Sequence, residues 1–160
     1  MEMNKYMKVA DELARDNLVT NVGGPFGAVV VKNGEIVGRG SNHVLANNDP
    51  TAHAEVTAIR DACKNLGTYD LTGCEIYTSC YPCPMCLSAI IWANIKTVYY
   101  GNTKEDAASI GFRDDFIYNY LEKLGSGEDS SDTLKLIGMD RQDTIGAFSA
   151  FAEMQDKTIY

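Results

Sequence analysis

Long apolar runs, a secretory leader and internal repeats are all missing from this sequence. No run of about 18 apolar residues occurs, so we expect no membrane-spanning helix and no membrane partner. The chain starts Met-Glu-Met-Asn-Lys-Tyr-Met-Lys, with no apolar run before a small-residue cleavage site, so we expect no signal peptide. The composition, with 45% apolar and 22% charged residues, is that of a folded protein rather than a disordered one.

Positive charge is also in short supply. Lys and Arg together number 14 against 22 for Asp and Glu, which gives a formal net charge of −8. Binding to the phosphate backbone of a nucleic acid requires a cationic surface. We therefore expect no nucleic-acid polymer as partner, whereas a small neutral molecule is compatible with this charge.

The five cysteines cannot all pair in disulfides, because their number is odd. Without a secretion signal, this number indicates a reducing compartment, in which thiols serve as metal ligands or as small buried residues. The sequence therefore predicts a cytoplasmic protein with no disulfide framework.

The length of 160 residues is that of one compact domain, which buries roughly 70% of the surface that its unfolded chain exposes. Hydrophobic periodicity and turn residues predict the order α-β-β-α-β-α-β-α-β-α. The dipeptide Asn33-Gly34 is the clearest local feature, because both residues tolerate the positive φ of a two-residue hairpin turn. The predicted helices cover residues 3–20, 51–66 (starting at Pro50 or Thr51), 84–93, 114–124 and 142–154, and the predicted strands cover residues 26–32, 35–40, 74–79, 96–100 and 133–138. This alternation favours a mixed five-stranded sheet with helices on both faces, a three-layer α/β/α fold.

Two short segments contain residue types that bind zinc in proteins. His53 and Glu55 lie in Thr-Ala-His-Ala-Glu at one predicted helix start, and Cys83 and Cys86 lie in Pro-Cys-Pro-Met-Cys at the next. A C-x-x-C turn lets two thiolates reach one ion, and His53 completes a Cys₂His set. Three protein ligands leave the fourth position of a tetrahedral zinc for water, whose pKa then falls to about 7. Glu55 is suited to move protons there without being a ligand.

Other interpretations of these motifs remain open. A C-x-x-C pair alone is more often a structural zinc site or a redox pair. Cys80, Cys83 and Cys86 also form C-x-x-C-x-x-C, a spacing that suits an iron–sulfur cluster. Such a cluster usually needs a fourth thiolate, and only Cys63 and Cys74 are left, neither at the expected spacing. On the zinc hypothesis these two and Cys80 are small buried residues.

The combination of H-x-E with P-C-x-x-C is typical of the zinc-dependent nucleobase deaminases. On these motifs the chain resembles the cytidine deaminase-like superfamily over nearly its whole length. Longer runs resemble the bacterial guanine deaminases in particular, and the last run and the aromatic C-terminus are the most discriminating. These runs are residues 23–32 (GGPFGAVVVK), 48–60 (NDPTAHAEVTAIR), 83–93 (CPMCLSAIIWA) and 111–118 (GFRDDFIY).

The resemblance implies one zinc-dependent deaminase domain over residues 1–160, which converts guanine to xanthine and ammonia with one zinc per subunit. Glu55 would take a proton from the activated water and return it to a ring nitrogen, work that is typically worth about 10²–10⁴-fold in rate. Asp114 would bind guanine and assist proton transfer to the leaving amine. The other substrate-binding residues that the resemblance implies are Phe26 on the base, Asn42 at its polar edge, Ala54 and Tyr160.

Three of these residues also have a simpler explanation. Phe26 fits the first core residue of a strand, and Asn42 fits a turn residue bonded to its own backbone. Asp114 fits the N-cap of the helix that follows Gly111.

One position departs from the resemblance. Where these deaminases usually have Glu, two residues before the first zinc cysteine, this chain has Tyr81. We expect zinc binding to survive, but a contact behind the ligands and the preferred ring are open to change. The alternatives are therefore a deaminase of guanosine, cytosine or an aminotriazine, a tRNA-adenosine deaminase, and a non-enzymatic structural zinc or iron–sulfur module.

The C-terminal segment 133–160 has an apolar face in its predicted helix, which includes Ile145, Phe148 and Phe151. The resemblance implies that this segment crosses to the other subunit of a homodimer and covers its site. The small polar residues of 125–132 would permit such an exchange. The alternative is an ordinary helix that packs within its own chain.

Overall fold

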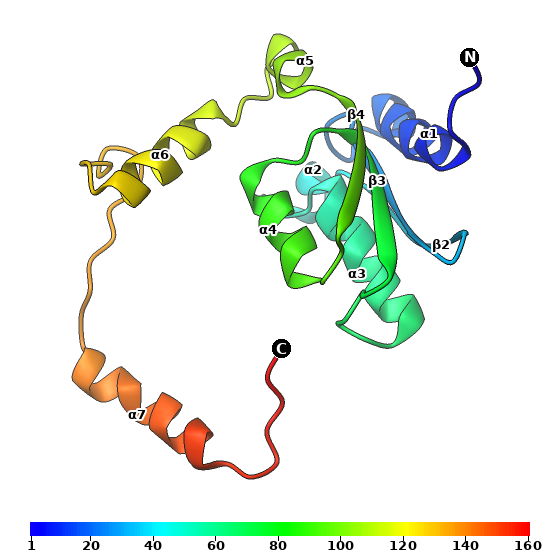
Figure 1. The fold of residues 1–160 in the computed structure, drawn as a ribbon. Coiled ribbons are helices and arrows are strands. Elements are labelled where there is room, and N and C mark those ends of the chain that lie inside the picture. The colour runs from blue at the N-terminus through cyan, green and yellow to red at the C-terminus, as the bar shows by residue number, and fades with distance from the viewer. The chain divides into compact units, whose positions relative to one another are not determined.

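The computed structural model describes residues 1–160, which form four strands and seven helices (Figure 1). The strands are β1 (Gly27–Lys32), β2 (Glu35–Ser41), β3 (Cys74–Cys80) and β4 (Thr97–Asn102). The helices are α1 (Lys5–Thr20), α2 (Val44–Asn47), α3 (Ala54–Leu66), α4 (Pro84–Trp92), α5 (Lys104–Ser109), α6 (Asp115–Ser126) and α7 (Arg141–Glu153).

The four strands form one mixed sheet in the order β2-β1-β3-β4. β1 is antiparallel to both β2 and β3, and β3 is parallel to β4 across the crossover through α4. The predicted hairpin turn is present, with positive φ angles of 49° at Asn33 and 81° at Gly34. The α/β class and the mixed sheet are therefore confirmed.

The predicted fifth strand, residues 133–138, is wrong. Residues 134–140 have no regular structure, and no other segment pairs with them. Leu134 and Leu136 alternate with other residues as in a half-buried strand, yet both side chains are exposed. Alternation predicts a strand only where a neighbouring strand supplies hydrogen bonds and a core, and the sheet ends at β4 instead.

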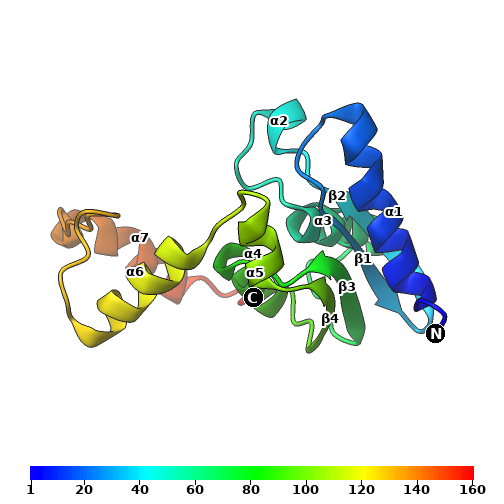
Figure 2. The same ribbon diagram turned by 90° about the horizontal axis from the view of Figure 1, so that it is seen from above.

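Helices cover both faces of the sheet, as the three-layer prediction required (Figure 2). Along β1 the side chains alternate: Val29 and Val31 pack toward α1, and Ala28 and Val30 pack toward α3 and α4. β1 is buried almost throughout, which explains why its sequence is a continuous apolar run. The sheet is thus the middle layer, with α1 on one face and α3 and α4 on the other.

Helix α3 lies unusually close to β2. A Cβ atom on Gly40 would stand 2.4 Å from the backbone oxygen of Ala54 and 2.4 Å from the backbone nitrogen of Ala58. A Cβ on Gly38 would stand 2.5 Å from the backbone oxygen of Ala58. The facing residues of α3, Ala54, Ala58 and Ala62, are fully buried. Small residues on both sides therefore bring the helix and the strand almost to backbone contact.

Helix α3 begins at Ala54, later than the predicted start at Pro50 or Thr51. The Asp49 side chain accepts hydrogen bonds from the backbone N–H and the hydroxyl of Thr51 at 2.9 and 2.7 Å. The Ala52 N–H bonds to the Asp49 carbonyl oxygen. Residues 49–52 therefore form a separate turn, because the short acidic side chain competes with the helix for these backbone donors.

Two short helices, α2 and α5, were not predicted. α5 begins with a capping box, in which Thr103 and Asp106 satisfy each other's backbone N–H groups. The chain divides into two compact units, Met1–Tyr118 and Asn119–Tyr160. The second unit contains most of α6 and all of α7, which confirms the predicted helices at 114–124 and 142–154. None of the helices has the length and apolar character that a membrane crossing requires.

Candidate active site

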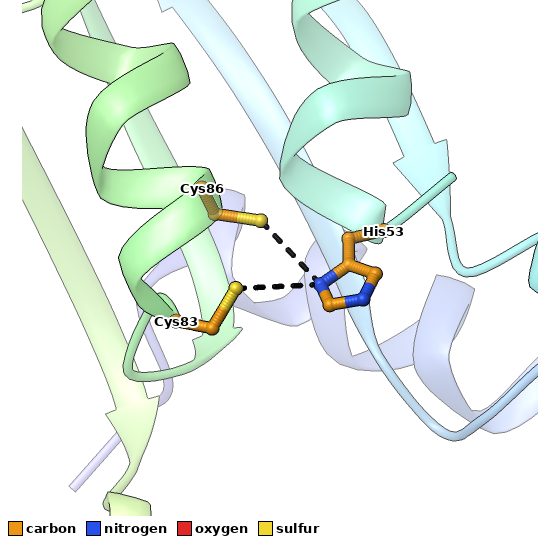
Figure 3. A group of neighbouring side chains, drawn as sticks. All are labelled: His53, Cys83 and Cys86. Atoms are coloured by element: carbon orange, nitrogen blue, oxygen red, sulfur yellow. Dashed lines mark hydrogen bonds between the residues drawn. The ribbon is translucent and has the colours of Figure 1, made fainter. Parts of the chain in front are cut away.

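Three potential metal ligands meet between the first turns of α3 and α4 (Figure 3). One ligand atom from each of His53, Cys83 and Cys86 lies within 4.8 Å of the others. The His53 Nδ1 atom is 3.5 Å from the Cys83 Sγ atom and 3.6 Å from the Cys86 Sγ atom. The sequence prediction that these three residues form one cluster agrees with this geometry.

The spacing of these atoms fits a tetrahedral zinc ion. With Zn–N of about 2.0–2.1 Å and Zn–S of about 2.3 Å, a nitrogen and a sulfur ligand lie about 3.6 Å apart. The observed nitrogen–sulfur separations are 3.5 and 3.6 Å. The side chains therefore have the separation that one zinc would impose, and one imidazole with two thiols is a donor set that zinc prefers.

Two of the ligands are helix N-caps. His53 precedes α3 with φ −67° and ψ 160°, and Cys83 precedes α4 with φ −66° and ψ 168°. Neither side chain caps its helix with a hydrogen bond, so both are free to turn toward the cluster. Pro84 at the start of α4 fixes the local φ, and Cys86 follows within the first turn.

The pKa values of the two thiols are shifted in opposite directions. Hydrogen bonds from Cys86 and then from His53 lower the pKa of Cys83 to about 4. The same contact with Cys83, together with burial, raises the pKa of Cys86. The hydrogen bond to Cys83 also raises the pKa of His53. The positive ends of the two helix dipoles favour a thiolate at this point, which is the form that binds a cation.

Glu55 lies against the cluster without belonging to it. Its side chain is only 7% exposed and is directed toward Cys86, whose Sγ atom is 3.3 Å from Oε2. The other oxygen, Oε1, accepts a hydrogen bond of 3.0 Å from the Thr78 hydroxyl. Burial raises the pKa of Glu55, which suits a group that must hold a proton for part of a reaction.

Asn42 has the backbone role that its simpler explanation predicted. Its Oδ1 atom accepts a hydrogen bond from the Val44 N–H at 3.1 Å, as in an Asx turn. Its backbone oxygen accepts from the Asn17 side chain at 2.8 Å. Asn42 is buried. Of its side-chain amide only the oxygen takes part in these hydrogen bonds, so the Nδ2 donor remains for a ligand.

Phe26 and Asp114 occupy different settings. Phe26 packs on the core and meets the edge of the Phe112 ring at 5.0 Å, and it also borders a cavity of about 370 Å³ that contains none of the metal ligands. Asp114 immediately precedes α6, and its carbonyl accepts from Ile117. Burial and then the charge of Cys83 raise the pKa of the Asp114 side chain.

The two remaining predicted residues are Ala54 and Tyr160. Ala54 is fully buried as the first residue of α3, between the ligand His53 and Glu55. Tyr160 ends the second unit with its side chain exposed. A contribution of Tyr160 to a substrate site stays a prediction.

The sequence analysis missed a cluster around Lys104. Its ammonium group lies 5.3 Å from the centre of the Tyr81 ring and 4.5 Å from the centre of the Tyr118 ring. Tyr81 also meets the edge of the Tyr100 ring at 5.0 Å. The Tyr118 hydroxyl is buried without a hydrogen-bond partner, and burial raises its pKa to about 12. Tyr81, which replaces the usual Glu, therefore takes part in a cation–π contact.

Known proteins resemble this chain along most of its length. Residues 1–102 match the family described as the cytidine and deoxycytidylate deaminase zinc-binding region. The chain is 54% identical to the guanine deaminase of Bacillus subtilis over 123 residues, which are 77% of this chain and 79% of that protein. It is 46% identical to the tRNA-specific adenosine deaminase of Aquifex aeolicus over 76 residues, which are 48% of this chain and 50% of that protein.

Solved structures give the same picture. The crystal structure of guanine deaminase from Bacillus subtilis superposes with a TM-score of 0.90 at 44% identity, covering 100% of this chain and 99% of that one. The guanine deaminase from Nitrosomonas europaea superposes with a TM-score of 0.65 at 34% identity, covering 68% of this chain and 63% of that one.

Proposed function

The chain belongs to the zinc-binding family of the cytidine and deoxycytidylate deaminases, and we propose that it hydrolyses guanine to xanthine and ammonia. The observation that carries this proposal is the Cys₂His cluster with the Glu55 carboxylate packed against it. Guanine is the proposed ring because the Bacillus subtilis enzyme that matches the chain from end to end is named a guanine deaminase.

His53, Cys83 and Cys86 would hold the zinc ion, since their donor atoms have the separations that a tetrahedral site requires. When bound, zinc supplies Lewis acidity, which lowers the pKa of water to about 7 and makes hydroxide available at neutral pH. The ring carbon that bears the amino group is the electrophile. Water adds to this carbon, ammonia leaves, and the carbonyl of xanthine remains.

Glu55 moves the protons of this reaction. Its Oε2 atom lies beside the ligand cluster, whereas Oε1 is bonded to Thr78 and is turned away. The carboxylate takes one proton from water and returns it to a ring nitrogen, then assists departure of the amine. Because Glu55 is buried, its carboxyl group exchanges these protons with the substrate rather than with bulk solvent.

Five further residues complete the proposed substrate site. Asp114, whose pKa is raised by burial and by the charge of Cys83, binds the ring and assists proton transfer to the leaving amine. Asn42 offers its Nδ2 donor to a polar edge of the base. Phe26 packs on the ring, and Ala54 offers a small surface between two reacting groups. Tyr160 completes the site from the C-terminal segment.

We also infer a cytoplasmic homodimer in which the segment 133–160 is exchanged between subunits. The support for this inference is the apolar character of the segment combined with its exposure. Phe148 is 76% exposed, and Leu136 and Ile137 are exposed as well. Exposed apolar side chains that gather in one segment usually pack against a partner. A second subunit of this chain is the proposed partner.

The rival interpretations have less support. An iron–sulfur cluster would need Cys80, but the Cys80 thiol donates to the Thr103 carbonyl oxygen and is absent from the ligand group. A tRNA substrate is disfavoured by the net charge of −8. Guanosine, cytosine and aminotriazines remain substrates to be tested beside guanine.

The test is ammonia release by zinc-loaded protein with guanine, run beside guanosine, cytosine and adenine at equal concentrations. Turnover of guanine alone is the expected result. Turnover of another ring in its place would retain the zinc chemistry and contradict the substrate. With one zinc bound per chain and no ammonia from any ring, the deaminase proposal would be wrong and a structural zinc module would replace it.

A further inference from the structure

The two oxygens of the Glu55 carboxylate have different partners. Oε1 accepts a hydrogen bond of 3.0 Å from the Thr78 hydroxyl, and Oε2 lies 3.3 Å from the Cys86 sulfur. Both Glu55 and Thr78 are buried, at 7% and 1% exposure. The carboxylate therefore lies between a strand of the sheet and a metal ligand, with one contact to each.

Only one of these two contacts can persist in a zinc-loaded protein. A cysteine that binds a metal does so as a thiolate, so Cys86 then has no proton to donate to Glu55. The remaining donors to the carboxylate are the Glu55 backbone N–H and the Thr78 hydroxyl. Thr78 is thus the one side chain outside the ligand set that holds Glu55.

Thr78 is itself held firmly. It lies in β3, an inner strand of the sheet, where it pairs with Ala28 of antiparallel β1 and with Tyr100 of parallel β4. Branching at Cβ restricts its side chain to few rotamers. The hydroxyl also lies 3.1 Å from the Cys80 carbonyl oxygen. Its single proton therefore has two acceptors within reach, this carbonyl and Oε1 of Glu55. The position of the hydroxyl is therefore set by the sheet rather than by the site.

We propose that Thr78 is a positioning residue that holds Oε1 of Glu55 and so aims Oε2 at the ligand cluster. This inference rests on the proposed deaminase function, in which Glu55 transfers the protons. Without the hydroxyl, the carboxylate would lose its donor from the sheet and rotate away from the reacting atoms. The opposing explanation is that Thr78 only fills a buried space, in which case valine would replace it without loss.

Two substitutions separate these explanations. Thr78→Val keeps the branched shape and removes the hydroxyl, whereas Thr78→Ser keeps the hydroxyl and removes the methyl. Losing a partner behind a metal site typically costs about 10–100-fold. We expect Thr78→Val to lower kcat for guanine by about 10–100-fold with KM and zinc content unchanged, and Thr78→Ser to retain most of the activity. Thr97→Val is the matched control, because Thr97 lies in β4, where it pairs with Glu75 and makes no hydrogen bond to Glu55.

Unfolding in urea gives a readout that does not depend on turnover. Thr78→Val should lower the urea midpoint of the zinc-loaded protein more in the wild-type background than in Glu55→Ala, where no carboxylate is left without its donor. Equal shifts in both backgrounds would overturn the inference. So would a wild-type kcat in Thr78→Val, or a loss in Thr78→Ser as large as that in Thr78→Val. If the wild type releases no ammonia while the two shifts differ, the proposed function fails and the Thr78–Glu55 contact stands.

Discussion

The close approach of α3 to β2 makes Gly40→Ala a severe test of the structure. The added Cβ would lie 2.4 Å from the Ala54 oxygen and the Ala58 nitrogen, whereas ordinary contact starts at 3.4 Å. Both obstructing atoms are backbone atoms, so no change of rotamer can relieve the overlap. Helix α3 must therefore move away from the sheet by about 1 Å, because that is the difference between the two distances.

The expected cost has two parts. Overpacking a tight site costs about 1–3 kcal/mol, which outweighs the roughly 0.5–1 kcal/mol that replacing a strand glycine by alanine returns. At about 2–4 °C per kcal/mol for a chain of this length, we expect Tm to fall by several degrees. The N-terminus of α3 carries His53 and Glu55, and a 1 Å misplacement of reacting groups can cost about 100-fold in rate.

Thermal unfolding by circular dichroism and ammonia release from guanine measure these two parts on zinc-loaded protein. Gly125→Ala is the control, because nothing lies within 4 Å of a Cβ on this exposed residue of α6, which is outside the segment 133–160. Alanine there should leave Tm unchanged or raise it, since it favours the helix. A Gly40→Ala variant with the Tm and kcat of the wild type would show that α3 does not lie on β2 as described.

Three further predictions concern the site and its surroundings. Glu55→Gln keeps an oxygen that accepts from Thr78 but removes the group that carries the proton, so kcat for ammonia release should fall by about 10²–10⁴-fold while zinc content stays at one per chain. A smaller loss would mean that another group transfers the proton. Lys104→Met removes the cation that lies against the rings of Tyr81 and Tyr118, a contact worth about 0.5–1 kcal/mol, so the free energy of unfolding in urea should fall by about that amount, whereas Tyr81→Phe keeps the ring and should match the wild type. Hydrogen bonds from Thr103 hold the pKa of Asp106 below its usual 3.8, so its stabilising effect is present at neutral pH and is lost as the pH falls through the lowered pKa; the Tm difference between wild type and Asp106→Asn should be seen at pH 7 and shrink below about pH 3.8, and a difference that grows in acid would reverse the sign.

Local chemistry made part of the fold predictable. Asn33-Gly34 determines its turn by itself, because the positive φ angles are a property of these two residues. The metal cluster was predictable for the same reason, since its ligands His53, Cys83 and Cys86 belong to short motifs at two helix starts. These features depend on residues that are close together in the sequence, so the sequence alone is enough to predict them.

Features that depend on distant partners were not predictable in the same way. Residues 133–138 have the alternation of a strand, but whether a strand forms depends on an edge to pair with. Thr78 reads as one more buried strand residue, and only the crossing of β3 beneath α3 brings it to Glu55, 23 positions away. Lys104 likewise meets Tyr81 only after the chain has passed through α4 and β4. The capping box of Thr103 and Asp106 was visible in the sequence and would have revealed α5.

The placement of His53 and Cys83 as the residues that precede their helices limits where this chain can change length over evolutionary time. An insertion in the loop ahead of α3 or α4 moves the ligand and its helix together, so the site survives. One residue added between Cys83 and Cys86 would turn the second thiol by about 100° around the helix axis, away from the first. We therefore expect length variation among natural homologues to gather in the preceding loops and to stop abruptly at these two residues.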